Sequence, residues 1–128
     1  MNMKKQILVV DDELSIRMLL ENFLSDEYDV VTKDNGYEAM TWFQEGNTAD
    51  LILVDIDMPM VNGYELTENI RKQAGMEKVP VIMLSSKQKS SDRIKSFTVG
   101  ADDYLQKPFN PEELMVRIQV IFRRMTAA

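Results

Sequence analysis

Five short apolar runs alternate with amphipathic segments along the chain. The runs at 6–10, 51–54 and 79–84 are almost wholly apolar, and the weaker runs at 29–32 and 103–106 also hold charged or polar residues. An apolar run of this length without a period of two is typical of a parallel strand that is covered on both faces. The pattern therefore predicts three central strands and two edge strands.

The segments between these runs place apolar residues three and four positions apart, which is the spacing of one stripe along a helix. Strand followed by helix, five times, predicts an α/β fold with an open parallel sheet and right-handed crossovers. No linker or low-complexity stretch divides the sequence, so we expect one domain over residues 1–128. The expected stripes are Ile16, Leu19, Leu20, Phe23 and Leu24; Ala39, Met40 and Phe43; Leu66 and Ile70; Ile94 and Phe97; and Leu114, Ile118, Ile121 and Phe122.

The composition excludes several kinds of chemistry. The chain has no cysteine and no histidine, which rules out disulfides, a Ser-His-Asp triad, zinc bound by Cys or His, and a phosphohistidine on this chain. The net charge of −6 argues against direct nucleic-acid binding, despite a small basic cluster at Arg123 and Arg124. No apolar run approaches the roughly 18 residues of a membrane span, and the N-terminus lacks a signal-peptide core, so we expect a cytoplasmic protein without membrane contact.

Polar side chains follow four of the expected strands. Because ligands of an open parallel sheet bind beyond the carboxyl ends of its strands, these side chains are candidates for one site. They are acids, hydroxyl groups or a lysine, according to the strand: Asp11, Asp12 and Glu13 after the first strand, Asp55 and Asp57 after the third, Ser85 and Ser86 after the fourth, and Lys107 after the fifth.

The acids among them favour a metal site and phosphoryl transfer. If the first and third strands are neighbours, Asp11, Asp12 and Asp55 converge, and their repulsion raises their pKa values unless a cation neutralises them. Carboxylates and backbone carbonyls without His or Cys are ligands that suit Mg²⁺. A metal, a lysine and a hydroxyl group around one carboxylate are the parts of a phosphoryl-transfer site. Asp55 would be its nucleophile and would form an acyl phosphate.

Four stretches, "ILVVDDE", "LILVDIDMPMVNGYEL", "VPVIMLSS" and "GADDYLQKPF", in this order and spacing resemble the receiver domain of bacterial two-component response regulators. The resemblance covers about residues 5–124. It implies a five-stranded doubly wound parallel sheet with the strand order 2-1-3-4-5, the flavodoxin-like (CheY-like) three-layer sandwich. It also implies a partner, a sensor histidine kinase or a histidine phosphotransfer protein. The last third most resembles receivers of the OmpR/PhoB type, which carry winged-helix DNA-binding domains.

The resemblance also assigns roles to the residues at the metal and phosphoryl site. Asp55 matches the aspartate that accepts the phosphoryl group from the phosphohistidine of the kinase. Asp12 and Asp55 would bind Mg²⁺ directly, together with the backbone carbonyl of Asp57, and Asp11 would act through water. We expect no enzyme that turns over other substrates, only a domain that catalyses its own phosphorylation and dephosphorylation.

Three further positions match the residues that sense the phosphoryl group. Ser85 stands where the family usually has a threonine, and its hydroxyl would bond the phosphoryl oxygens. Lys107 would pair with the phosphate, and its peptide bond to Pro108 is expected to be cis. Tyr104 matches the aromatic switch residue that turns inward as Ser85 moves.

Five charged residues in the last third resemble the set through which such receivers form parallel dimers when phosphorylated: Lys95, Asp102, Asp103, Glu113 and Arg117. They lie on the elements expected near 94–97, 103–106 and 114–122. The resemblance implies a phosphorylation-dependent homodimer through this face. A solvated surface has the same charged composition, so this alternative stays open.

Two less typical residues, Asp57 and Lys87, flank the expected path of the water that attacks the acyl phosphate. Our hypothesis is that they form an ion pair over the site and slow its hydrolysis, which tunes the lifetime of the phosphorylated state.

Two other functions are compatible with parts of this pattern. A phosphatase of the haloacid-dehalogenase type would use Asp55 as nucleophile and Asp57 as acid and base, but that family places the pair on its first strand and its other acids downstream. A binding module with the receiver fold that is not phosphorylated usually lacks an acid or the lysine, and this chain has all of them. Turnover of a generic phosphate ester would favour the phosphatase, whereas a single labelling event with Mg²⁺ would favour the receiver.

Overall fold

A five-stranded parallel sheet with the order β2-β1-β3-β4-β5 forms the centre of the structure, a computed structural model that describes residues 3–126. The strands are β1 (Gln6–Val10), β2 (Asp29–Lys33), β3 (Leu51–Asp55), β4 (Val81–Ser85) and β5 (Asp103–Gln106). The helices are α1 (Leu14–Leu24), α2 (Gly36–Gln44), α3 (Gly63–Lys72), α4 (Ser90–Thr98) and α5 (Pro111–Thr126). The predicted fold class, strand order and edge strands are confirmed.

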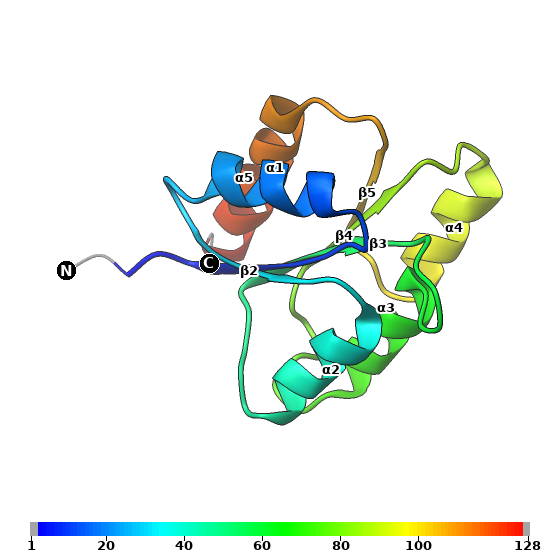
Figure 1. Ribbon diagram of the computed structural model, residues 1–128, viewed down its shortest axis with the longest axis horizontal. Helices are drawn as coiled ribbons and strands as arrows, with labels where there is room; N and C mark the ends of the chain where they lie inside the picture. Colours follow the sequence, from blue (N-terminus) through cyan, green and yellow to red (C-terminus); the bar gives the residue numbers. More distant parts are fainter. Residues whose placement is uncertain (1–2, 127–128) are drawn as a thin grey trace.

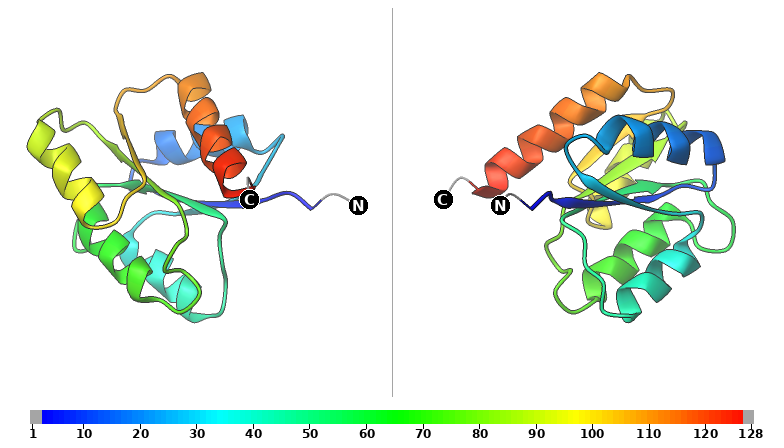
Figure 2. Two further views of the ribbon diagram at one scale, coloured as in Figure 1. Left: turned by 180° about the vertical axis from the view of Figure 1, so that it is seen from behind. Right: turned by 60° about the vertical axis from the view of Figure 1, so that its left-hand side comes forward.

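The helices form two layers that enclose the sheet. Helices α1 and α5 lie on one face, and α2, α3 and α4 lie on the other, as the views from the front, the back and the side agree (Figures 1 and 2). Successive residues of β1 point into the two layers, Ile7 and Val9 toward α1 and α5, and Leu8 and Val10 toward α2 and α3. Both faces of the central strands are therefore buried, which explains runs that are apolar without alternation.

Three expectations from the sequence differ from the structure. Leu19, expected on the apolar stripe of the first helix, is 41% exposed. Strand β4 begins at Val81 and not at residue 79, because Pro80 has no N–H to donate to a neighbouring strand and the carbonyl of Val79 accepts a hydrogen bond from Arg71. The stripe expected on the fourth helix is wrong, since Ile94 and Phe97 are 65% and 48% exposed. The buried residue of α4 is Ser96, whose hydroxyl donates to the Asp92 carbonyl one turn earlier.

No helix among residues 3–126 is both long and apolar enough to cross a membrane.

The loop between β3 and α3 is held close against the end of β3. Asn62 caps α3 by accepting from the Glu65 N–H, and the Glu65 side chain accepts from the Asn62 N–H in return. Gly63 begins the helix and donates its N–H to the carbonyl of Ile56 at 2.9 Å. A Cβ atom at Gly63 would lie 2.6 Å from the carbonyl oxygen of Asp55 and 2.7 Å from the Cα of Ile56. Only glycine lets the helix approach the strand this closely.

We predict that Gly63→Ala lowers the free energy of unfolding by about 2–4 kcal/mol, since the methyl group meets backbone atoms that cannot rotate away. At an open helical position the same change would stabilise the protein by about 0.5–1 kcal/mol. Chemical denaturation of both proteins measures the difference. As a control, Gly75→Ala meets no atom within 4 Å and strains only a residue with φ of +83°, so it should cost about 1–2 kcal/mol. An unchanged or higher stability of Gly63→Ala would contradict the prediction.

Candidate functional site

The carboxyl ends of the parallel strands bring the predicted site residues together. Val10 pairs with Val54 in the register of β1 and β3, so the residues that follow, Asp11 and Asp55, lie side by side. Both are buried, with 0% and 2% exposure. Ser85 ends β4 and is fully buried, and Lys107 follows β5 and donates its backbone N–H to the Ser85 carbonyl. Chain segments from four strands therefore meet at one edge of the sheet.

Four acidic residues form a cluster at this edge. One carboxylate oxygen from each of Asp11, Asp12, Glu13 and Asp55 lies within 4.8 Å of the others. Asp11 and Asp55 are buried, and Asp12 and Glu13 are exposed, so the cluster is open to solvent on one side. An all-oxygen donor set with one open side fits Mg²⁺, which keeps several of its waters. The predicted ligands Asp11, Asp12 and Asp55 are thus brought together, and Glu13 joins them.

Lys107 places its ammonium group among these carboxylates. Its Nζ lies 2.8 Å from Asp11, 3.2 Å from Glu13 and 3.4 Å from Asp55, and its side chain is 11% exposed. The peptide bond between Lys107 and Pro108 is cis, as expected. Glu13 was not assigned a role from the sequence, although its place directly after two aspartates and before a helix could have indicated one.

The pKa values follow from burial and from the unequal number of charges. Burial and the neighbouring Asp11 carboxylate raise the pKa of Asp55 to about 7, although the ammonium of Lys107 works in the opposite direction. Burial also raises the pKa of Asp11, against the effect of its hydrogen bond with Lys107. Burial lowers the pKa of Lys107, but the adjacent carboxylates outweigh it and keep the ammonium charged. The site therefore holds excess negative charge that a divalent cation would balance.

Ser85, Asp57 and Lys87 form a hydrogen-bonded group beside the acid cluster. The Ser85 hydroxyl donates to the Asp57 carboxylate at 3.3 Å and accepts from the Lys87 N–H at 3.0 Å. The Lys87 ammonium lies 3.5 Å from the same carboxylate, which raises the pKa of Lys87. The ion pair in our hypothesis is thus present in the structure, with both side chains partly exposed. Its effect on hydrolysis stays a prediction.

Tyr104 connects this group to the sheet. Its ring is buried, with 7% exposure, and its hydroxyl donates to the backbone carbonyl of Lys87 at 2.5 Å. Lys87 lies in the loop between β4 and α4, two residues after Ser85. The predicted switch residues Ser85 and Tyr104 therefore contact the same residue, Ser85 at its N–H and Tyr104 at its carbonyl.

The five charged residues of the expected dimer face are not joined in one network of ion pairs. Arg117 lies 3.0 Å from both Asp103 and Glu113. Asp102 lines a shallow cavity together with Asp103 and Arg117, but its carboxylate is engaged elsewhere: it pairs with Arg71 at 3.1 Å and accepts from the Val81 N–H.

Lys95 contacts α3, with its ammonium 4.5 Å from the centre of the Tyr64 ring. The residue of α4 that lines a cavity together with Glu113 and Arg117 is Arg93. Sequence reasoning missed Arg93, because a helix with few apolar residues does not show which of its charged side chains faces its neighbour.

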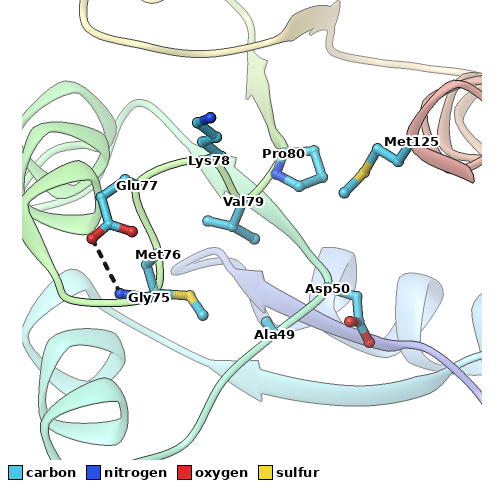
Figure 3. A pocket seen from close by; sticks show the side chains of 9 residues that line it. All are labelled: Ala49, Asp50, Gly75, Met76, Glu77, Lys78, Val79, Pro80 and Met125. Atoms are coloured by element: carbon cyan, nitrogen blue, oxygen red, sulfur yellow. Dashed lines mark hydrogen bonds between the residues drawn. The ribbon is translucent and has the colours of Figure 1, made fainter. Parts of the chain in front are cut away.

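The opposite edge of the sheet carries a cavity of about 490 Å³ without such chemistry (Figure 3). Two of its lining residues directly precede a strand, Asp50 before β3 and Pro80 before β4. The cavity therefore lies at the amino ends of these strands. Its acids are engaged with the backbone: Asp50 accepts from the Gln6 N–H and Glu77 from the Gly75 N–H. The convergent polar groups of a reactive site lie at the carboxyl edge instead.

Comparison with known proteins identifies the family. Residues 7–119 match the family model described as "Response regulator receiver domain". A relative from Cyanophora paradoxa, named "Probable transcriptional regulator ycf27", is 46% identical over 122 residues, which are 94% of this chain and 49% of the relative. The "Alkaline phosphatase synthesis transcriptional regulatory protein PhoP" of Bacillus subtilis is 41% identical over 127 residues, 98% of this chain and 52% of the relative. The chain spans about half the length of these relatives.

A solved structure agrees with these relatives. The structure described as "BeF3 Activated DrrB Receiver Domain" matches with a TM-score of 0.85 and 29% identity, over 94% of this chain and 99% of that one; DrrB is described elsewhere as a Thermotoga maritima OmpR/PhoB homolog. None of these comparisons supports a phosphatase or a receiver fold that is not phosphorylated. The chain therefore belongs to the response regulator receiver domains of two-component signal transduction.

Proposed function

We propose that residues 1–128 form a single receiver domain that takes a phosphoryl group onto Asp55. The donor would be the phosphohistidine of a sensor histidine kinase or of a histidine phosphotransfer protein. The observation that carries the proposal is the buried Asp55 carboxylate, 2% exposed, with the Lys107 ammonium 3.4 Å away and three other acids around it. A nucleophile held between a cation and a metal site is the arrangement that phosphoryl transfer requires.

The transfer would depend on Mg²⁺. Asp12 and Asp55 would bind it directly together with the backbone carbonyl of Asp57, and Asp11 would hold one of its waters. When bound there, Mg²⁺ would supply positive charge that offsets the repulsion between the Asp55 carboxylate and an incoming phosphate. Lys107 already lies 2.8 Å from Asp11 and 3.4 Å from Asp55, so its ammonium can pair with a phosphoryl oxygen on Asp55 after a small movement.

The output would be a change on the face formed by α4, β5 and α5. Phosphorylation adds roughly −1.5 to −2 charges, which is enough to bias a nearby element between two arrangements. Ser85 and Tyr104 both bond to Lys87, at the start of the loop that leads to α4. We propose that phosphorylated chains dimerise through this face.

Apolar side chains on that face support the dimer, since Ile94, Phe97 and Val116 are 65%, 48% and 56% exposed. Charged residues lie on the same helices, and of these Arg93, Glu113 and Arg117 line one cavity. In the longer relatives, which are named transcriptional regulators, such a change would reach the remaining half of the protein. With a net charge of −6, this domain would not bind nucleic acid itself.

We predict that acetyl phosphate with Mg²⁺ labels the wild-type protein once and that Asp55→Ala remains unlabelled. Intact mass spectrometry would show the added phosphoryl group, and size-exclusion chromatography with light scattering would show a larger share of dimer in the labelled sample. Omission of Mg²⁺ should remove both effects. Equal labelling of Asp55→Ala would overturn the assignment of the acceptor, and continued turnover of acetyl phosphate or of p-nitrophenyl phosphate would favour a phosphatase.

We predict that Asp55→Asn is more stable than the wild type at pH 8 without metal. The raised pKa of Asp55, about 7, means that the folded state binds a proton more tightly than the unfolded chain does, so the charged Asp55 opposes folding above pH 7. This cost disappears as the pH falls toward about 4. Asparagine carries no charge at any pH.

The expected gain is about 2–4 kcal/mol in the free energy of unfolding at pH 8, and it should shrink by more than half at pH 5. Urea denaturation in EDTA measures it at both values. Added Mg²⁺ should narrow the gap at pH 8, because it stabilises the wild type more than the variant. A gap that is absent, or that is the same at pH 5 and pH 8, would contradict the raised pKa.

We predict that Lys87→Ala shortens the lifetime of phosphorylated Asp55. The ion pair between Lys87 and Asp57 is partly exposed, and pairs of this kind contribute up to about 1 kcal/mol, which corresponds to about a two- to fivefold faster dephosphorylation. Loss of label with time, followed by mass spectrometry, measures the rate. Lys89→Ala in the same loop is the matched control and should leave the rate unchanged. If Lys87→Ala decays like the wild type, the ion pair does not tune the lifetime.

A further inference from the structure

The hydroxyl group of Ser85 has an acceptor in the absence of a phosphoryl group. Ser85 is fully buried, and its hydroxyl donates to Asp57 Oδ2 at 3.3 Å while it accepts from the Lys87 N–H at 3.0 Å. A serine hydroxyl has a single hydrogen to donate. The same hydrogen therefore cannot bond to Asp57 and to a phosphoryl oxygen on Asp55.

We propose that the Asp57 carboxylate competes with the phosphoryl group for the Ser85 hydroxyl and so holds the domain in its unphosphorylated arrangement. Asp57 is then a positioning residue, whose side chain acts through Ser85. The inference rests on the proposed function, in which a phosphoryl group on Asp55 is the competing acceptor. It is separate from the lifetime of that group, which concerns the attack of water.

Competition is physically reasonable because the two acceptors are of the same kind. Both are anionic oxygens, and a hydrogen bond to a charged acceptor contributes more than one between neutral groups. The bond of 3.3 Å is longer than the usual 2.5–2.7 Å of a hydroxyl on a carboxylate, so it is weak enough for a phosphoryl oxygen to displace it. Serine also lacks the methyl group of threonine, so its χ1 angle is less restricted and the hydroxyl can turn between the two acceptors.

The arrangement connects this choice to the rest of the switch through Lys87. Its ammonium pairs with Asp57 at 3.5 Å, its N–H donates to Ser85, and its carbonyl accepts from Tyr104. When the Ser85 hydroxyl turns away from Asp57, its hydrogen bond with the Lys87 N–H therefore changes as well. Lys87 is also the residue whose carbonyl accepts from Tyr104. In this way Asp57 sets how much phosphoryl binding energy is needed before the loop between β4 and α4 responds.

Beryllofluoride tests the proposal, because it occupies the place of a phosphoryl group without chemical turnover, and the DrrB receiver domain is described as activated by it. With Mg²⁺ present, Asp57→Ala should bind beryllofluoride about three- to tenfold more tightly than the wild type, the amount expected for release of one competing hydrogen bond. The Asp57 side chain is 47% exposed, so its removal leaves the core intact. Isothermal titration calorimetry measures the affinity. The NMR signal of the Lys87 amide, which donates to Ser85, should shift in the free Asp57→Ala protein.

A double-mutant cycle separates this effect from the loss of a negative charge. In the Ser85→Ala background, where no hydroxyl remains, Asp57→Ala should change the affinity by less than about twofold. Equal tightening in both backgrounds would show that Asp57 acts by charge alone and would overturn the proposal, as would no tightening in the wild-type background.

A second background tests whether the released ammonium of Lys87 binds the ligand. In Lys87→Ala, the further change Asp57→Ala should still tighten binding about three- to tenfold, and loss of the effect there would overturn the proposal. If the wild type does not bind beryllofluoride with Mg²⁺ at all, the proposed function itself fails. If the wild type binds beryllofluoride tightly but Asp57→Ala changes the affinity equally in the presence and absence of the Ser85 hydroxyl, only the role of Asp57 is rejected.

Discussion

The site depends on the unequal balance between two buried carboxylates and the ammonium of Lys107. Asp11 and Asp55 are 0% and 2% exposed, and an uncompensated charge in such a place costs several kcal/mol. Lys107 lies 2.8 Å from one and 3.4 Å from the other, which compensates a single negative charge and leaves the second. This remaining charge raises the pKa of Asp55 to about 7 and favours a divalent cation. The same imbalance that opposes folding is therefore what the proposed Mg²⁺ would relieve.

The parallel topology makes this balance possible. Lys107 and Asp11 are 96 residues apart in sequence, and they meet only because β1, β3, β4 and β5 end at one edge of the sheet. The two helical layers bury the central strands on both faces, so the polar residues of β1, β3 and β4 lie at the strand ends. The apolar core and the acidic edge are therefore two results of the same arrangement.

The sequence predicted those parts of the molecule that depend on the length and composition of segments. The buried apolar runs predicted the strands, and the acids that follow these runs predicted which residues form the acid cluster. Features that depend on side-chain direction were not predicted: Ile94 and Phe97 point outward, and Arg71 holds the carbonyls of Val79 and Gly100. The bond between Ser85 and Asp57 belongs to the same group. Each of these depends on where a neighbouring element places its partner, which no local pattern encodes.

The charged residues of the expected dimer face are already satisfied within the chain. Arg117 is 38% exposed and pairs with both Asp103 and Glu113, so a dimer that uses these groups exchanges existing pairs and gains little free energy from them. The exposed apolar side chains of α4 and α5, by contrast, lose contact with water only when a second surface covers them.

Burial of Ile94, Phe97 and Val116 would therefore supply most of the free energy of the proposed dimer, and the charges would set its register. Helix α4 is suited to respond to the site, because Ser96 is its buried residue and few apolar contacts hold it in place. Under the proposed function, a small change at Ser85 and Lys87 would then alter how these apolar side chains are exposed.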